Sequence, residues 1–487
     1  MAVVKLDILA HADFSGRLRK SKKAPGAGIF GAAVEKLRQL NPQGTLLLDA
    51  GDEFSTTFWP GRPMVEAVSL LKTDAMTLGN HEFDRGEDFL NDCIAHADFP
   101  ILCANIIRKS DGQLIPGTLP WIILERQGIK IGVLGLTTEY TPYMVTATSF
   151  SPYQVLSCVE AAQKYLPQMR QAGAQITVLL SHIPFYVDTD GNISGELVDI
   201  LQEIPPVDVC IGGHIPGDYA GVLGNTIVLK GGFSGKSLCH AALYFDTGTE
   251  QITDRSCRIH LTDWEATPME PYQSHAARVT APFKDFFERP LTTTSQTWQV
   301  RLSSETKLGN FLAQAVQEAA GTQIAYINAT SSSGTIQPGT VTAEDITGVM
   351  GFNDPILRAE ITGAQIWELF ELVYVPERYG NNAGLMHAGL IISVDHTQPA
   401  FKKIQSISLS DGTPVQPDRI YTVATSEYMA SGGNDTAQLA NQLSWESAGI
   451  LMYDALFASI ERHHCLYVTP EQRVIEIGRP ENDNAPF

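Results

Sequence analysis

The stretch Asp74-Ala-Met-Thr-Leu-Gly-Asn-His-Glu-Phe-Asp84 determines how the rest of the chain is interpreted. Its apolar residues 75–78 predict a short buried strand that ends at Gly79. Asn80, His81, Glu82 and Asp84 follow in the next loop, before a helical pattern begins at Glu87. In an α/β sheet, ligands bind at this end of the strands. On its own, the stretch is explained equally well as an ordinary loop between a strand and a helix.

Four other apolar runs carry polar groups at the same end. The runs 6–10, 45–49, 176–180 and 207–211 lead to Asp13, Asp52, His182 and His214. Because the carboxyl ends of such strands meet at one edge of a sheet, we expect these groups to lie near Asn80. Carboxylate, amide and imidazole ligands together suit a divalent ion such as Mn²⁺, Zn²⁺, Fe²⁺ or Mg²⁺.

The alternation of strands and helices in the first half predicts a largely parallel sheet. Residues 129–136 and 121–124 are expected to form a hairpin, and residues 155–172 a long helix. Residues 268–289 have a helical period, and residues 292–296 are expected to bridge two domains. A second α/β alternation follows and is expected to end in an amphipathic helix over residues 446–463.

The order of the motifs resembles the calcineurin-like metallophosphoesterases. These motifs are Asp13, Gly51-Asp52, Gly79-Asn80-His81-Glu82, Ser181-His182 and Gly212-Gly213-His214. Asn80-His-Glu-Phe-Asp84 is similar to the 5′-nucleotidase branch, and Leu308-Gly-Asn-Phe-Leu and Ser431-Gly-Gly resemble the C-terminal domain of that branch. The resemblance implies an α/β fold class with an N-terminal two-sheet α/β/β/α domain. The expected boundaries are 1–265 for that domain, 266–300 for a helical linker and 301–487 for a C-terminal α/β substrate domain.

The resemblance also implies a chemistry, in which two ions share a bridging carboxylate and a metal-activated hydroxide attacks phosphorus. Asp52 would be the bridge, and Asn80, His182 and His214 would complete one metal position, with Asp13 beginning the other. His81 would assist catalysis as an imidazole that binds no metal, and Asp84 would hold its orientation.

One metal position departs from the family pattern. Ser15 stands where the pattern Asp-x-His has histidine, and Pro216 stands where a second histidine is expected after His214. One ion is therefore predicted firmly, and the second remains open. Asp218 and His11 are possible substitute ligands, although each is also explained as a solvated acid or a packed strand histidine. An all-oxygen position would favour Mg²⁺ or Mn²⁺.

The predicted substrate contacts also depart from the family. No arginine follows Asn328 in the run Asn328-Ala-Thr-Ser-Ser-Ser-Gly334, and the expected stacking rings are absent from residues 384–390 and 432–436. The hydroxyls of residues 331–333 and Gly334 could cradle a small anion instead, although a serine-rich turn is the preferred interpretation of this run. The candidate substrate-binding residues are Asn105, Asn328, Ser333, Gly334, Gly432 and Gly433.

Composition limits the remaining possibilities. A net charge of −20 argues against a nucleic-acid polymer or an anionic membrane as partner. Seven cysteines without a C-x-x-C pair, after an N-terminus without a signal-peptide pattern, predict a cytoplasmic protein. The expected substrate is a small phosphorylated molecule, possibly a nucleotide. Two alternatives to a phosphoester hydrolase stay open: a pseudoenzyme that binds metal without turnover, and a hydrolase of non-nucleotide esters.

Overall fold

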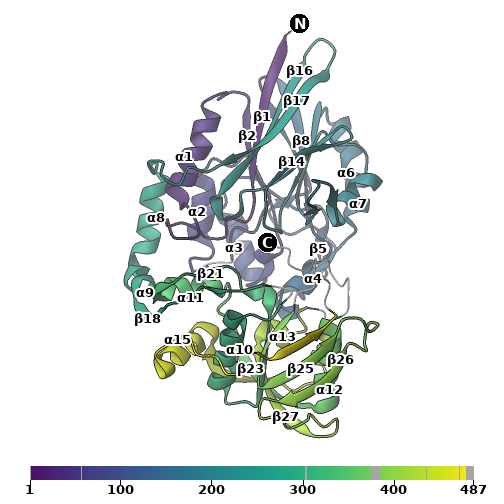
Figure 1. The fold of residues 1–487 in the computed structure, drawn as a ribbon. Coiled ribbons are helices and arrows are strands. Elements are labelled where there is room, and N and C mark those ends of the chain that lie inside the picture. Colours follow the sequence, from purple (N-terminus) through teal and green to yellow (C-terminus); the bar gives the residue numbers. More distant parts are fainter. Residues whose placement is uncertain are drawn as a thin grey trace. The chain divides into compact units, whose positions relative to one another are not determined.

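The computed structural model describes residues 2–55, 58–301, 304–374, 384–434, 436–470 and 472–478. The chain forms two compact units, Met1–Pro282 and Phe283–Phe487 (Figure 1). The division falls inside the segment 266–300 that was predicted as a linker. None of the helices in the described residues has the length and hydropathy needed to span a bilayer.

Two sheets form the centre of the N-terminal unit. The first contains, in spatial order, β17 (Gln251–Leu261), β16 (Ser237–Asp246), β1 (Val3–His11), β2 (Thr45–Asp49), β3 (Ala75–Thr77), β4 (Ile101–Leu102) and β6 (Thr118–Leu119). The second contains β14 (Tyr219–Leu223), β15 (Thr226–Lys230), β13 (Val209–Gly212), β10 (Ile176–His182), β8 (Ile129–Thr137) and β7 (Trp121–Arg126). The strands from β1 to β6 are parallel, as are β15, β13, β10 and β8. The predicted hairpin of β7 and β8 is also present.

The main core lies between the two sheets, because alternate residues of each strand face it. On β1, Leu6, Ile8 and Ala10 point into this core, while Asp7 and His11 fall on the other face of the strand. The second sheet supplies matching apolar residues, including Ile131 and Val178. Burial on both faces explains why these strands are continuous apolar runs in the sequence.

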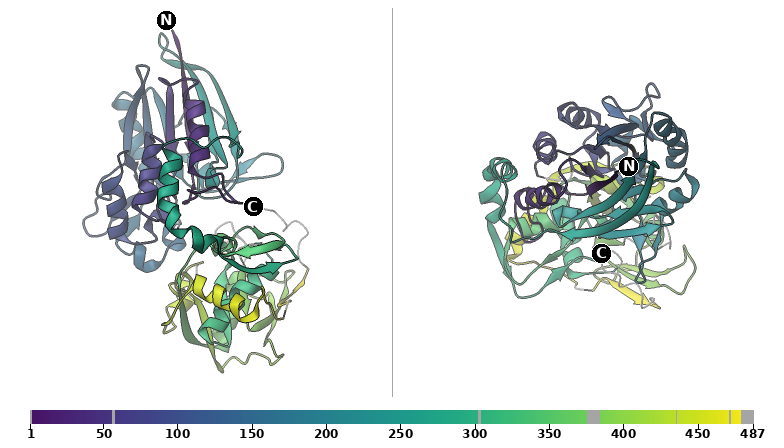
Figure 2. Two further views of the ribbon diagram at one scale, coloured as in Figure 1. Left: turned by 90° about the vertical axis from the view of Figure 1, so that its left-hand side faces the viewer. Right: turned by 90° about the horizontal axis from the view of Figure 1, so that it is seen from above.

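Helices cover the outer faces of both sheets. On the first sheet these are α1 (Ala27–Arg38), α2 (Arg62–Leu70), α3 (Glu87–His96) and α8 (Tyr272–Thr280). The purple helix α1 and the teal helix α8 run side by side (Figure 2). On the second sheet α6 (Cys158–Gln171) and α7 (Glu196–Glu203) share a second apolar cluster with the strands. The predicted α/β/β/α fold class is confirmed.

Short elements connect these layers. They are η1 (His81–Phe83), β5 (Ile106–Arg108), α4 (Thr141–Met144), α5 (Ala147–Phe150), β9 (Tyr153–Val155), β11 (Tyr186–Val187), β12 (Ile193–Ser194), η2 (Phe233–Gly235), η3 (Ala281–Phe283) and α9 (Lys284–Glu288). The helix predicted over 155–172 starts later than expected. Ser157 caps it by accepting a hydrogen bond from the backbone N–H of Glu160, and the residues before Ser157 form β9.

The C-terminal unit is built on a five-stranded and a three-stranded sheet. The first contains β24 (Leu385–Ala388), β20 (Ile324–Asn328), β27 (Ile420–Ser426), β23 (Pro355–Thr362) and β28 (Glu446–Leu451), and the second β26 (Ile404–Leu409), β25 (Leu390–Asp395) and β29 (Val474–Ile477). Two small antiparallel pairs join β18 (Pro290–Thr294) to β22 (Gly339–Thr342) and β19 (Trp298–Gln299) to β21 (Thr335–Ile336). The helices are α10 (Lys307–Ala320), η4 (Ala329–Ser331), α11 (Ala343–Val349), α12 (Gly363–Val373), α13 (Glu427–Ala430), α14 (Ala437–Ala440) and α15 (Met452–His463).

Two predictions for this unit were wrong. Residues 446–451 form the strand β28 on β23, so that the last helix begins only at Met452. Residues 290–294, within the predicted bridge and linker, pair with β22 as a strand. In both cases pairing with a strand distant in sequence decided the conformation.

Candidate metal centre and active site

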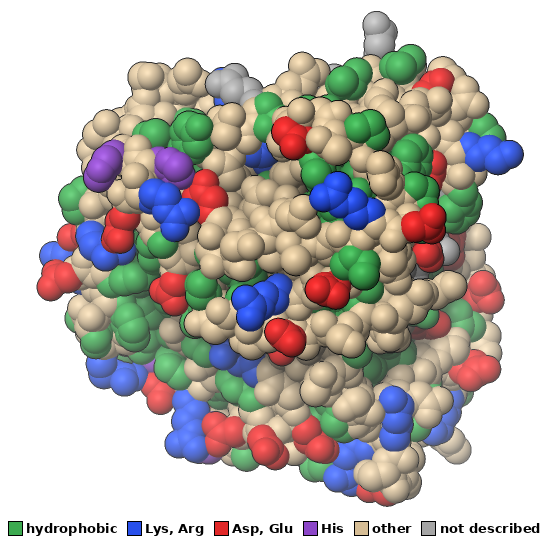
Figure 3. Space-filling model, turned by 90° about the horizontal axis from the view of Figure 1, so that it is seen from below, with side chains coloured by type: hydrophobic (Ala, Val, Ile, Leu, Met, Phe, Trp, Pro, Cys, Tyr) green, Lys and Arg blue, Asp and Glu red, His purple; other side chains and the backbone are tan. Residues whose placement is uncertain are grey.

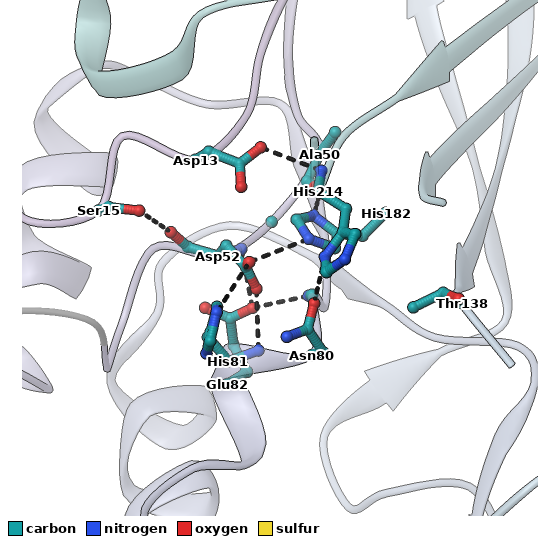
Figure 4. Close-up of polar contacts among 12 residues, drawn as sticks. Asp13, Ser15, Ala50, Asp52, Asn80, His81, Glu82, Thr138, His182 and His214 are labelled. Atoms are coloured by element: carbon teal, nitrogen blue, oxygen red, sulfur yellow. Dashed lines mark hydrogen bonds and ion pairs between the residues drawn. The ribbon is translucent and has the colours of Figure 1, made fainter. Parts of the chain in front are cut away.

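The carboxyl ends of β2, β10 and β13 bring Asp52, His182 and His214 together (Figure 4). One ligand atom from each of these three side chains lies within 4.8 Å of the other two. Asp52 and His182 are buried, and His214 is partly exposed. The predicted convergence of strand ends on one place is therefore present in the structure.

The backbone fixes the orientation of His182. Its Nδ1 lies 2.6 Å from the carbonyl oxygen of Ala50, which requires Nδ1 to carry the proton. Its Nε2 lies 3.0 Å from Oδ2 of Asp52, and this carboxylate outweighs the effect of burial and raises the pKa of His182 to about 9. A cation held between the two groups would displace the Nε2 proton, as metal binding to an imidazole requires.

His214 and Asn80 form the other side of the same centre. Nδ1 of His214 lies 2.8 Å from Oδ1 of Asn80. This separation is that of a hydrogen bond, which joins Asn80 to the group formed by Asp52, His182 and His214. The four side chains therefore converge on one place, where they would hold a divalent ion.

Three residues of the centre have unusual backbone conformations. Asp13, Asp52 and His214 have φ values of 57°, 65° and 73°, in the left-handed region that residues with a Cβ seldom occupy. Asp13 lies beyond the end of β1, and its Oδ2 accepts a hydrogen bond of 3.1 Å from the backbone N–H of His214. Non-glycine residues in this region are concentrated at functional sites.

His81 is placed to act next to the metal ligands. Its Nδ1 lies 2.9 Å from Oδ2 of Asp84, and its Nε2 lies 3.9 Å from Oδ2 of Asp52. Its backbone N–H donates to Oδ1 of Asp52 at 2.9 Å. Burial opposes the charged imidazole, but Asp84 and Asp52 outweigh that effect and raise the pKa of His81 to about 10. Asp84 therefore both orients His81 and favours its protonated form.

The other groups of the centre differ in protonation. Burial and the neighbouring His182 lower the pKa of His214 to about 3, so His214 is neutral as a metal ligand must be. Burial raises the pKa of Asp13 to about 7. For Asp52, burial acts in the same direction, but His182 and His81 outweigh it and hold the pKa below its ordinary value. Asp52 thus keeps its negative charge.

Glu82 organises the loops that carry these ligands, a role that sequence reasoning missed. It is fully buried, and its carboxylate accepts four backbone hydrogen bonds. The donors are the N–H groups of Asp52 at 2.9 Å, Glu53 at 2.7 Å, Phe54 at 3.0 Å and Gly79 at 2.6 Å. The sequence signal for this role was the position of Glu82 directly after His81 in the motif.

The second metal position has no full set of ligands. Ser15 Oγ donates to the backbone carbonyl of Asp52 and does not serve as a ligand. Asp218, predicted as a possible substitute, is exposed and accepts a hydrogen bond from Ser237 Oγ, which corrects that prediction. Lys230, also missed from the sequence, is buried nearby, and its Nζ donates to the Phe185 carbonyl at 2.9 Å. Burial lowers the pKa of Lys230, and Asp13 opposes that shift.

His11 does not join Asp13, which corrects a second prediction. The two side chains do not share a strand face, because β1 ends at His11 and Asp13 has already left the extended conformation. His11 instead belongs to a separate group with Asp49 and Glu53.

Asn105 has a structural role in the N-terminal unit. Its side chain is fully buried, its Nδ2 donates to the Thr137 carbonyl at 2.7 Å, and its Oδ1 accepts from the Thr137 N–H at 3.0 Å. Both amide atoms thus hold β8, and a role of Asn105 in substrate binding stays a prediction.

The predicted substrate residues of the C-terminal unit differ in exposure. Ser333 and Gly334 are exposed, while Asn328 is buried and its Oδ1 has no hydrogen-bond partner in the described part of the chain. Gly432 and Gly433 are buried in a turn, where Gly433 lies against the ring of Tyr428. A role for these residues in substrate binding stays a prediction.

Charges are mixed on the face of the molecule shown in Figure 3, where acidic and basic side chains alternate without a continuous basic patch. This distribution and the net charge of −20 offer little to a polyanionic partner.

Comparisons with known proteins agree with this site. Residues 10–218 match the family model of the calcineurin-like phosphoesterases, and residues 290–441 match that of the 5′-nucleotidase C-terminal domain. The chain is 26% identical to a snake venom 5′-nucleotidase from Gloydius brevicauda, over 96% of this chain and 87% of that protein. It is 27% identical to the trifunctional nucleotide phosphoesterase YfkN of Bacillus subtilis, over 86% of this chain and 32% of that protein.

A solved structure shares the whole fold. The 5′-nucleotidase precursor of Thermus thermophilus superimposes with a TM-score of 0.83 at 20% identity, covering 98% of this chain and 100% of that one. The matched domains and the converging ligands define a metal-dependent phosphoester hydrolase. Among such enzymes, the chain belongs to the 5′-nucleotidase branch of the calcineurin-like metallophosphoesterases. These relatives support a phosphoester hydrolase and favour neither of the alternatives that the sequence left open.

Proposed function

We propose that this chain hydrolyses the phosphate ester of a small nucleotide, with one divalent ion held by Asp52, Asn80, His182 and His214. The observation that carries the proposal is the convergence of these side chains, with ligand-atom separations of 2.8 and 3.0 Å. When bound there, the ion would polarise the phosphoryl group and lower the pKa of a water molecule.

The protein's own groups supply the other parts of the reaction. His81 is next to the ion site, and its raised pKa keeps a proton on the ring near neutral pH. That proton is available to the departing ester oxygen, and its charge stabilises the negative charge that develops on the phosphoryl group. Asp84 lies 2.9 Å from Nδ1, so that the other ring nitrogen, Nε2, is turned towards Asp52 at 3.9 Å and the proposed ion site.

A nucleotide is the substrate class supported by the relatives, whose printed names are 5′-nucleotidase and nucleotide phosphoesterase. The C-terminal unit lacks the arginine and the stacking rings that the family resemblance leads one to expect. Because base stacking contributes about 1–3 kcal/mol per base in comparable sites, we expect weak discrimination among bases.

A substrate panel tests the proposal directly. Purified protein with added Mn²⁺ is assayed against the 5′-monophosphates of adenosine, guanosine, cytidine and uridine, and against glycerol phosphate and a sugar phosphate. We expect the four nucleotides to be cleaved with kcat/KM values within about tenfold of one another and above those of the other esters. Equal rates for glycerol phosphate would contradict a nucleotide preference.

His81→Ala tests the catalytic assignment. General acid catalysis contributes about 10²–10⁴-fold, so kcat should fall by that factor while bound metal stays unchanged. Asp84→Asn should lower kcat less and shift the pH profile, because the ring loses its charged partner. Activity of His81→Ala near the wild-type level would remove His81 from the mechanism.

We also propose that the protein works in a reducing compartment such as the cytoplasm. Its seven cysteines are all free thiols, and five of them are buried. Fractionation of the native cells would test this location. Recovery of the protein from outside the cytoplasmic membrane would contradict the proposal.

A further inference from the structure

A second group of metal-binding side chains lies in the N-terminal unit, apart from the proposed active site. It consists of His11, Asp49 and Glu53, and one ligand atom from each lies within 4.8 Å of the other two. His11 is 1% exposed, and the other two are fully buried. We call these three residues the buried triad.

Strand pairing places the buried triad on the helix-covered face of the first sheet. His11 and Asp49 are direct partners in the parallel register of β1 and β2, so their side chains lie on the same face. Glu53 follows in the loop after β2. The ring of Phe30 from α1 packs edge-on against the His11 ring at a centroid distance of 5.2 Å. An apolar cavity lined by Phe30 and Tyr272, among others, reaches Glu53.

Four polar atoms of the buried triad have no hydrogen-bond partner in the described chain. Asp49 Oδ1 accepts from the Gly51 N–H at 2.9 Å and Glu53 Oε1 from the Phe14 N–H at 3.0 Å, which leaves Asp49 Oδ2 and Glu53 Oε2 without partners in the described chain. Neither ring nitrogen of His11 has a hydrogen-bond partner in the described chain. Buried polar atoms without a partner destabilise a folded protein and are rare, so four such atoms at one place call for a ligand.

The two carboxylates of the buried triad face different nitrogens of the His11 ring. His11 Nε2 lies 3.9 Å from Asp49 Oδ2, and His11 Nδ1 lies 3.6 Å from Glu53 Oε1, distances that are too long for hydrogen bonds. A single ion binds through only one of these nitrogens, so the carboxylate on the other side has to move towards it. One ligand atom from each of the three residues already lies within 4.8 Å of the other two.

We propose that His11, Asp49 and Glu53 bind a second divalent cation. This site lies on the helix-covered face of the first sheet. One imidazole nitrogen and two carboxylate oxygens are ligands for Zn²⁺ or Mn²⁺. Two buried carboxylates would offset the charge of such an ion. The site stabilises the strand ends that carry Asp13 and Asp52 and does not touch the substrate.

Burial predicts the exchange behaviour of this cation. The ligands have almost no exposed surface, so the ion would enter during folding and leave only when the unit opens. The ion of the active centre has the partly exposed His214 among its ligands and should exchange with the solvent. A chelator applied to the folded protein should therefore separate the two sites.

The experiment counts ions per chain by elemental analysis. The full-length protein is refolded with Mn²⁺ or with Zn²⁺ and then freed of unbound metal. We expect two ions per chain for the wild type, one for Glu53→Gln and one for His214→Ala. EDTA on the folded wild type should remove one ion, and EDTA in denaturant should remove both. Glu203→Gln, at the exposed end of α7, is the matched control and should keep two.

Several results would overturn the proposal. These are an unchanged ion count in Glu53→Gln, a wild-type protein with a single ion that His214→Ala removes, and complete loss of metal to EDTA in the folded state. If Glu53→Gln fails to fold, Asp49→Asn and the chelation experiment on the wild type decide. Because the readout is ion content, loss of the proposed nucleotidase activity would leave this test unaffected.

Discussion

Replacing Glu82 should loosen the loops that hold the metal ligands. Its carboxylate is the acceptor for four buried backbone N–H groups, which belong to Gly79 and to residues 52–54. Each donor left without an acceptor costs about 1–3 kcal/mol. Water that enters the space of the lost side chain would recover part of this. We therefore expect Glu82→Ala to lower the free energy of unfolding by about 4 kcal/mol.

Glu82→Gln should have an intermediate effect. Its amide keeps one oxygen as acceptor for two of the four donors and turns an NH₂ group towards the other two. We expect Glu82→Gln to lower the free energy of unfolding by roughly 2 kcal/mol, half of the effect of Glu82→Ala. The substitution also replaces a charged acceptor with a neutral amide, which forms weaker hydrogen bonds.

Denaturant unfolding and hydrogen exchange measure these effects. The unfolding midpoint of the N-terminal unit should decrease in the order wild type, Glu82→Gln, Glu82→Ala. Exchange of the backbone amides of residues 52–54 should accelerate in both variants, and Glu203→Gln should behave as wild type. If Glu82→Ala unfolds within 1 kcal/mol of the wild type and these amides stay protected, the assigned role of the carboxylate is wrong.

Three further predictions concern other parts of the N-terminal unit. Ser15→His combined with Pro216→His should add one ion per chain in elemental analysis, because both missing imidazoles return; an unchanged count would show that the loop no longer places them. Asp7→Asn should destabilise the protein by about 1–3 kcal/mol at pH 7, since Asp7 is bonded to His240 at 2.6 Å. Burial opposes ionisation of Asp7, but its hydrogen bonds outweigh that effect and lower its pKa, so the stability difference between wild type and variant should narrow as pH falls below about 4. A stability difference between wild type and Asp7→Asn that widens in acid would contradict this prediction. Asn105→Ala should lower stability by about 1–3 kcal/mol and leave KM within twofold, whereas a large KM increase would restore a substrate role.

The central strands were predictable because they are buried on both faces. Residues 45–49 form β2 with the predicted bounds, and Asp52, Asn80, His182 and His214 follow strands as expected. Continuous apolar runs identify such strands, and the chain direction then identifies the edge of the sheet where their polar neighbours meet.

The buried triad was hidden from sequence reasoning. Alternation along β1 suggested that His11 and Asp13 share a face, but the left-handed conformation of Asp13 ends the alternation. Asp49 is the last residue of a predicted strand, and no motif in the sequence singles out Glu53. Their association requires the register of β1 and β2, which no local pattern provides.

The edge strand β28 was misread for a related reason. Residues 446–451 are mostly exposed, so they lack the apolar run that marks a central strand. Their conformation comes from pairing with β23, which is distant in sequence. Local periodicity joined them to the helix that follows.

The left-handed backbone at Asp13, Asp52 and His214 has a consequence for protein engineering. Each residue holds a conformation that costs a side chain about 1–2 kcal/mol and that glycine adopts freely. Selection for thermal stability alone would therefore favour glycine at these positions and produce more stable proteins that no longer bind metal. Libraries screened for thermostability should keep these three codons fixed.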